Sequence, residues 1–314
     1  MVNHDPNRVR TVLRRARSVA EMSSFRGGIG STASRTAALA FRPKPTDVLI
    51  ATFPKCGTTW LQQIVHGLRT RGSMDFEEIT LVVPWLELAL DLGIDPGAPQ
   101  VAEPRAFKSH LSWYDVPKGG RYITMVRDPG DVLVSLYHFH EGWRFEAGAI
   151  TLEDYSRNFF LAPERDRGYW KHVASWWPQR GREDVLMLSY ESALADVPGT
   201  VRRIAGFIGC PLDDELLEIV VRQSSIGFMK AHGTRFDDHV LRAARNAANG
   251  LPPGGASSKL RSGRVGDHVD RLPMDVRAAL DGIWREAMES RFGLASYSEM
   301  VAALGPADGS LAIG

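Results

Sequence analysis

The sequence predicts an α/β fold in which helices flank a mostly parallel sheet, because short apolar segments alternate with longer helix-period ones. The apolar segments are bounded by turn or charged residues, as expected of parallel strands that are buried on both faces. They span residues 47–53, 106–111, 121–126 and 184–190. The helix-period segments span residues 58–69, 130–140, 169–178, 197–208 and 274–291. Strands that alternate with helices in this way favour a single α/β domain.

Length, composition and charge are those of an ordinary globular protein. The chain has 314 residues, of which 44% are hydrophobic and 24% charged, and its net charge is +1. This charge gives no indication of a nucleic-acid or membrane partner. No apolar run approaches the ~18 residues of a membrane span, and no secretory signal is evident. The two cysteines, Cys56 and Cys210, do not form a C-x-x-C pair, so we expect a protein of the reducing cytoplasm.

Residues 1–43 differ in composition from the rest of the chain. They contain eight arginines but only two acidic residues. This composition is typical of a basic extension that is packed on the surface or disordered, and an organelle transit peptide is the alternative. We therefore place the main domain at residues 44–314. Within it, residues 249–268 are rich in Gly, Pro and Ser and predict a long loop, which we interpret as a mobile lid.

Residues 51–65 (ATFPKCGTTWLQQIV) are predicted to form a strand end, a tight loop and a helix start. In an α/β sheet such a loop lies at the carboxyl end of the strand, where ligands bind. Backbone N–H groups at the new helix N-terminus favour an anion, Gly57 permits its close approach, and Lys55 adds a positive charge. The stretch therefore predicts a site for a phosphate-like group. A plain strand-to-helix turn that contains a lysine remains the alternative.

The usual phosphate loop of nucleotide hydrolases, G-x-x-x-x-G-K-[ST], is absent, because Lys55 precedes Gly57. Asp128, after another predicted strand, could be taken for a magnesium ligand. It precedes a proline, however, and the adjacent Arg127 would repel a cation. The site is therefore predicted to bind its ligand without a metal.

Two further strand ends carry polar residues of functional type. Arg127 ends one strand, and Ser135 lies about two turns into the helix that follows it, so both could bind a second phosphate. A surface pair between Arg127 and Asp131 is the alternative. Lys108 and His110 lie on the same face at the end of another strand. They suit a general base with a cationic helper, although a structural histidine is about equally favoured by these residues alone.

Together these segments resemble the cytosolic sulfotransferase family, which transfers sulfuryl groups from 3′-phosphoadenylyl sulfate (PAPS) to alcohols, phenols or amines. The resemblance covers roughly residues 45–291 and implies a sheet like that of P-loop nucleotide kinases. Six motifs carry it in the family's order: FPKCGTTW (53–60), KSHL (108–111), RDPGDVLVS (127–135), YWKHVASWW (169–177), SYESALADVPGTVRRIAGFIG (189–209) and RSGRVGD (261–267).

The resemblance implies which residues bind the donor. The 5′-phosphosulfate would be held by Lys55, Cys56, Gly57, Thr58, Thr59 and Trp60. The 3′-phosphate would be bound by Arg127, Ser135, Arg261, Ser262 and Gly263. The adenine would be contacted by Trp60, Tyr190, Ser224, Ser225, Ile226 and Met229.

The resemblance also implies the catalytic groups. His110 would accept the proton of the acceptor hydroxyl while its oxygen attacks sulfur in line. Lys55 would neutralise the charge that develops on the bridging oxygen, and Lys108 would steady the transferring group. Such transfer depends on positioning and electrostatics, and no metal is expected.

The acceptor is predicted to be a small hydroxyl compound, and candidate pocket walls are Trp85, Leu88, Trp113 and Phe139. A core position is the alternative for Trp85. The segment HGTRFDDHV (232–240) has a metal-like composition, but its family position makes it a loop over the acceptor site. The acceptor itself could be a phenol, an alcohol or a glycolipid.

Some residues depart from the family pattern. Cys56 replaces a serine, and a helix N-terminus could lower the pKa of its thiol and make it sensitive to oxidation. Ser262 replaces a lysine, and His268 replaces a frequent tryptophan. The family's short dimerisation motif is not preserved, so the oligomeric state is left open.

Two other functions remain possible at this point: an Mg-ATP-dependent kinase or NTPase, and a catalytically inactive nucleotide-binding protein.

Overall fold

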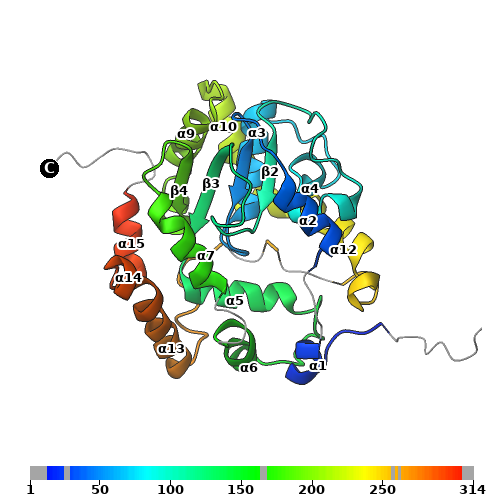
Figure 1. Ribbon diagram of the computed structural model, residues 1–314, viewed down its shortest axis with the longest axis vertical. Helices are drawn as coiled ribbons and strands as arrows, with labels where there is room; N and C mark the ends of the chain where they lie inside the picture. The colour runs from blue at the N-terminus through cyan, green and yellow to red at the C-terminus, as the bar shows by residue number, and fades with distance from the viewer. Residues whose placement is uncertain (1–12, 25–28, 163–167, 256–258, 261–262, 306–314) are drawn as a thin grey trace, which may run out of the picture.

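The computed structural model describes residues 13–24, 29–162, 168–255, 259–260 and 263–305. Its central sheet has four strands, all parallel, in the order β2-β1-β3-β4 (Figure 1). The strands are β1 (Val48–Ala51), β2 (Ala106–Ser109), β3 (Arg121–Val126) and β4 (Val185–Ser189). Every strand residue is buried except Arg121, which is partly buried. The prediction of a parallel sheet covered on both faces is therefore confirmed.

Helices cover both faces of the sheet, and alternate strand residues point into two separate cores. Val48 and Ile50 of β1 pack with α3, α9 and α10, whereas Leu49 and Ala51 pack with α5, α7 and α13. In Figure 1, α9 and α10 lie at the top of the molecule, and α5, α7 and α13 lie in front of the sheet or below it. These helices are α3 (Thr58–Thr70), α5 (Pro129–His140), α7 (Gly168–Trp176), α9 (Val197–Ile208), α10 (Asp214–Gln223) and α13 (Met274–Trp284).

The predicted elements are close to the observed ones, with differences at their ends. The helix predicted over 274–291 ends as α13 at Trp284 and continues as a π-helical turn and α14. Shorter helices were not predicted. They are α1 (Val19–Ser24), α2 (Thr32–Ala40), α4 (Ile79–Val82), α6 (Leu152–Tyr155), α8 (Tyr190–Ala195), α11 (Ile226–Ala231), α12 (His239–Arg245) and α15 (Tyr297–Leu304). Helix α14 (Ser290–Phe292) overlaps the end of the helix predicted over 274–291. Across the described ranges, no helix is long and apolar enough to cross a membrane.

The N-terminal range contains a helix that packs onto the domain. Helix α2 begins after Ser31, whose hydroxyl accepts a hydrogen bond from the N–H of Ser34. Ser34 and Ala38 are fully buried, and the helix packs against the 3₁₀ turn η1 (Leu86–Leu88). Packing of α2 on the domain agrees with an extension that is packed on the surface. The division of the chain at residue 43 stays a prediction.

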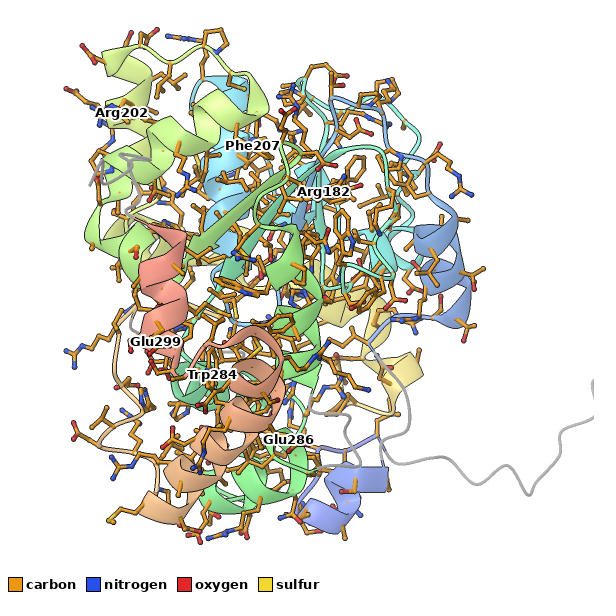
Figure 2. The ribbon with its side chains drawn as sticks, turned by 60° about the vertical axis from the view of Figure 1, so that its left-hand side comes forward. Arg182, Arg202, Phe207, Trp284, Glu286 and Glu299 are labelled. Atoms are coloured by element: carbon orange, nitrogen blue, oxygen red, sulfur yellow. The ribbon has the colours of Figure 1, made fainter. Side chains whose placement is uncertain are left out.

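Helices α13 and α15 pack near the turn that follows β3. Figure 2 shows α13, which carries the labelled Trp284, and α15, which carries Glu299, along the same side. The indole Nε1 of Trp284 donates a hydrogen bond to the carbonyl of Leu294, and its ring packs edge-on against Tyr297. The Tyr297 hydroxyl donates to a Glu191 carboxylate oxygen at 2.5 Å, and Glu191 accepts from the backbone N–H of Asp128. Helix α15 thereby holds, through Glu191, the turn that follows β3.

Candidate active site

One cavity of about 1060 Å³ lies at the carboxyl ends of β1, β2 and β3. Loops after these strands bring Lys55, His110 and Arg127 together in its lining. Of the predicted site residues, those that line it are Lys55, Gly57, Thr58, Thr59, Trp60, Trp85, Leu88, Lys108, His110, Arg127, Ser135, Phe139, Tyr190, Ser224, Ser225, Ile226, Met229 and Gly263.

Two predicted residues are not part of this lining. The Trp113 ring packs against Tyr122 and Trp176 instead, so the prediction of a pocket wall is wrong. Cys56 is fully buried beneath the loop. Burial raises the pKa of its thiol, against the expectation that the helix N-terminus would lower it. Arg261 and Ser262 lie outside the described residues.

The loop after β1 is shaped to receive an anion at the start of α3. Gly57 precedes this helix with φ +83°, and Lys55 also has a positive φ of 70°. A Cβ atom on Gly57 would come within 2.9 Å of the Met125 sulfur and 3.2 Å of the Tyr190 ring, so glycine is required here. Gly57 provides no side-chain cap, and the first residues of α3 line the cavity, so their backbone N–H groups are available to bind an anion.

Arg127 is held in place by several contacts at the end of β3. Its guanidinium donates hydrogen bonds to the carbonyls of Lys55, at 3.3 Å, and Arg264, at 3.0 Å. It also lies over the Tyr190 ring, 4.5 Å from the centroid. Ser135, two turns into α5, lines the same cavity. An arginine and a hydroxyl therefore both line this cavity, where a second phosphate could bind.

Asp128 is a helix cap. Its carboxylate accepts hydrogen bonds from the backbone N–H groups of Gly130 and Asp131, and Pro129 occupies the first turn of α5. This role accounts for an aspartate at the end of β3 without a metal ion.

Asp131 links α5 to the loop predicted over residues 249–268, which we call the late loop. Its carboxylate accepts hydrogen bonds from the backbone N–H groups of Gly266, at 2.9 Å, and His268, at 3.1 Å, and its Oδ1 lies 2.9 Å from His268 Nδ1. The Asp131 hydrogen bond raises the pKa of His268 against the opposing effect of burial. Asp131 is fully buried but only 3.6 Å from Arg127. This aspartate therefore joins Arg127 to the chain around Gly263 and Arg264.

His110 is held in one tautomer. Its Nδ1 lies 2.7 Å from the carbonyl oxygen of Thr52, and a carbonyl can only accept, so Nδ1 carries the hydrogen. Burial and the charge of Lys108 hold the pKa of His110 well below its usual value. The imidazole is therefore neutral, with the lone pair on Nε2. Trp85 packs edge-on against the ring at 4.8 Å and fixes its plane.

Two lysines flank His110 in the cavity. Lys55 Nζ lies 4.3 Å from the Phe139 ring centroid, and Lys108 Nζ lies 3.6 Å from the Trp85 ring. Burial, together with the Lys259 charge, lowers the pKa of Lys55 to about 7. Burial lowers the pKa of Lys108 to about 8, even though Asp238 acts in the opposite direction. A bound anion would favour the charged form of both lysines.

Residues from other segments, which no motif had indicated, also reach the cavity. Ile29, Ser31 and Arg35 line it from the N-terminal range. Gly30 approaches Leu88 so closely that a Cβ atom would lie 2.6 Å from that side chain. Asp238 and Lys259 also line the cavity. The position of the HGTRFDDHV segment over the site was predicted, but nothing in its pattern singled out Asp238 or its pairing with Lys259.

Comparisons with known proteins agree with this geometry. A family model described as the Sulfotransferase domain matches residues 45–292. The 3-alpha-hydroxysteroid sulfotransferase of Cavia porcellus is 31% identical over 259 residues, which cover 79% of this chain and 85% of the relative. Sulfotransferase 1C2 of Oryctolagus cuniculus is 27% identical over 261 residues, covering 80% and 86%.

Solved structures show the same fold. Mouse sulfotransferase SULT7A1 complexed with PAP has a TM-score of 0.64 at 20% identity, covering 88% of this chain and 93% of that one. Retinol dehydratase in complex with androsterone and inactive cofactor PAP has a TM-score of 0.63 at 22% identity, covering 80% and 83%. The match of the family model to most of the chain settles the family. The chain belongs to the sulfotransferase family, and it is an enzyme of the PAPS-dependent class.

Proposed function

We propose that this sulfotransferase transfers the sulfuryl group of PAPS to a hydroxyl group of a small acceptor, with His110 as the general base and without a metal ion. The observation that carries the proposal is the tautomer of His110. Its ring is neutral and its Nε2 is unprotonated, so Nε2 can accept a proton, and the ring lies in the same cavity as Lys55 and Lys108. A base, two cations and a helix N-terminus in one cavity are what this reaction requires.

The donor would lie across the ends of β1 and β3. Lys55 and the N–H groups from Gly57 to Trp60 would bind the 5′-phosphosulfate, and Arg127 with Ser135 would bind the 3′-phosphate. The two similar structures are named as complexes with PAP, which supports a nucleotide of this kind as the ligand. Tyr190, Ile226 and Met229 line the same cavity and would enclose the adenine.

The reaction would then proceed by in-line displacement. His110 Nε2 accepts the hydroxyl proton as the acceptor oxygen forms its bond to sulfur. The bond between sulfur and the bridging oxygen of the 5′-phosphate breaks, and the leaving phosphate gains negative charge that Lys55 neutralises. Lys108 binds a sulfuryl oxygen and keeps the group in line. The His110 proton is afterwards released to solvent.

Apolar side chains near His110 favour an amphipathic acceptor. Trp85 and Phe139 contact the two catalytic lysines. Leu88 lines the same cavity and packs close to Gly30 of the N-terminal segment. The name of the Cavia porcellus relative specifies a hydroxysteroid, and the retinol dehydratase complex contains androsterone. These names support an alcohol or a phenol on a bulky apolar body, and a glycolipid fits the same description. A cytoplasmic location stays a prediction.

The test is transfer of radioactive sulfate from ³⁵S-labelled PAPS to a panel of phenols, hydroxysteroids and glycolipids, with a chelator present. We expect labelled product with at least one class and no loss of rate in the chelator. Absence of product with every class, together with magnesium-dependent ATP turnover, would contradict the proposal.

A further inference from the structure

Asp238 and Lys259 form an ion pair in the wall of the candidate active site. Lys259 Nζ lies 2.5 Å from Asp238 Oδ1, and the two side chains are only 8% and 2% exposed. Both residues line the cavity that contains Lys55, Lys108 and His110. They come from different segments, since Asp238 precedes α12 and Lys259 lies in the late loop. The pair therefore brings part of the late loop to the reaction centre.

The backbone around Asp238 indicates that its position is specific. Asp238 adopts a left-handed conformation with φ 61° and ψ 27°, which residues other than glycine adopt at a cost. In this conformation its carboxylate points into the cavity lining and not to solvent. An ion pair that served only to fasten the loop could form at the surface, without burying either charge.

The charges around this pair are unbalanced. Lys259 is the neighbouring charge that most lowers the pKa of Lys55, and it also lowers that of Lys108, while Asp238 raises both. Three ammonium groups therefore lie near one another with Asp238 as their shared carboxylate. Arg127, which lies 3.6 Å from Asp131, also lowers the pKa of Lys55, whereas Glu87 and Glu78 raise that of Lys108. Burial of excess positive charge is unfavourable unless an anion binds there.

We propose that Lys259 is a further residue of the sulfuryl-transfer centre, where its ammonium group binds the sulfuryl group of the donor, and that Asp238 is the positioning residue that holds it there. This inference rests on the proposed function. Lys259 is not one of the residues that the sequence motifs assigned to the site. Its place two residues before Arg261 puts it in the loop that is expected to bind the 3′-phosphate, so donor binding and the placement of Lys259 would be coupled.

The test compares PAPS with PAP, because PAP lacks only the sulfuryl group. Each nucleotide is titrated calorimetrically into the full-length protein without acceptor. The key variant is the double substitution Asp238→Asn and Lys259→Met, which removes both charges and keeps the net charge of the pair. We expect it to bind PAPS about tenfold more weakly than the wild type, as expected for the loss of one hydrogen bond to a charged group. Its affinity for PAP should stay within about twofold.

The double variant distinguishes binding of the sulfuryl group by Lys259 from repulsion of that group by an unpaired Asp238 carboxylate. Lys259→Met alone leaves the Asp238 carboxylate unpaired, and that charge would itself repel the sulfuryl group. If the double variant regains the wild-type ratio of PAPS to PAP affinity, Lys259 does not bind the sulfuryl group and the inference is overturned. Equal losses for both nucleotides would also overturn it, since they would indicate a loop-holding role only. Lys44→Ala is the control, because Lys44 is exposed and lines a different cavity.

Two further variants test the positioning role of Asp238. Lys259→Arg retains the charge and should keep the PAPS preference within about threefold of the wild type. Asp238→Asn alone should match the double variant in its PAPS to PAP ratio, because Lys259 without its anchor no longer reaches the sulfuryl group. A double variant much weaker than Asp238→Asn alone would overturn the role of Asp238. If the wild type binds neither nucleotide, the proposed function itself fails, and this inference fails with it.

Discussion

The Nδ1 atom of His110 lies 2.7 Å from the backbone carbonyl oxygen of Thr52, the residue that follows β1. This single contact joins the base to the loop that is expected to bind the donor. It fixes the protonated nitrogen of the ring and leaves Nε2 as the base. The backbone N–H of His110 donates to Glu87 Oε1 at 2.7 Å, so the residue is held from both sides.

Replacement of His110 tests its role as the base. His110→Ala should lower the rate of sulfuryl transfer by about 10²- to 10⁴-fold, the usual contribution of a general base. The affinity for PAP, measured by calorimetry, should stay within about twofold, because the donor does not need the imidazole. A variant that transfers sulfate at close to the wild-type rate would show that another group accepts the proton.

Replacement of Arg127 tests recognition of the 3′-phosphate. Arg127→Lys keeps a positive charge but loses the planar fork, and it should weaken PAP binding about tenfold or more. Adenosine 5′-phosphate lacks the 3′-phosphate and should bind the variant and the wild type nearly equally. Because Arg127 also contacts Tyr190 and the Lys55 carbonyl, thermal unfolding of the variant is the control. Equal losses for both nucleotides would mean that Arg127 does not bind the 3′-phosphate.

The lysines of the site predict how nucleotide binding depends on pH. Before binding, the pKa values of Lys55 and Lys108 are about 7 and about 8, and a bound phosphate raises them. Binding above pH 7 must therefore take up protons, and the affinity for PAP should fall at least about tenfold between pH 7 and pH 9. Ionisation of phosphate, with a pKa of about 6, would act in the opposite direction. Proton uptake is measured by calorimetry in buffers of different ionisation enthalpy, and no uptake at pH 8 would contradict the prediction.

The His268–Asp131 contact predicts a separate pH effect on stability. The pKa of His268 is raised in the folded protein, so its contribution is complete below about 6.5, the usual histidine value. That contribution is lost as the pH rises through the raised value. His268→Gln should therefore lower the free energy of unfolding by about 1 kcal/mol at pH 6 and by less at pH 9. Chemical denaturation at both pH values measures this, and an equal loss at both would show that the charge of His268 is not involved.

Burial of Cys56 predicts that it resists thiol reagents. The side chain is fully buried and its pKa is raised, so little thiolate forms near neutral pH. In the native protein, labelling with a thiol reagent should reach the partly exposed Cys210 well before Cys56. Mass spectrometry of the labelled peptides distinguishes them. Rapid modification of Cys56 would restore the idea of a redox-sensitive loop.

Much of the site could be predicted because it is built from local sequence. Lys55, Gly57 and Thr58 lie within one strand–loop–helix turn, and the same holds for Arg127 and Ser135. Parallel strands end at the same edge of a sheet, so these turns had to meet once the strands were identified. Their residue types then indicated an anion.

The missed and misassigned residues depend on tertiary packing. Asp238 and Lys259 are 21 positions apart in the chain and meet in the wall of the cavity. Arg35 enters the lining because α2 packs on η1, and no periodicity in an arginine-rich segment indicates such a contact. Trp113 follows His110 by three residues, but its ring turns into the aromatic core with Trp176. The direction in which a loop tryptophan points is decided by its tertiary contacts, which the local sequence does not show.

The central claim is that this cavity binds a 3′-phosphorylated adenine nucleotide without a metal ion and uses it for sulfuryl transfer. Calorimetric titration of the wild type with PAP and with ATP, each with and without Mg²⁺, tests this most directly. We predict micromolar binding of PAP that does not change with Mg²⁺, and little binding of ATP. Preferential binding of Mg-ATP would contradict the account and indicate a kinase in its place.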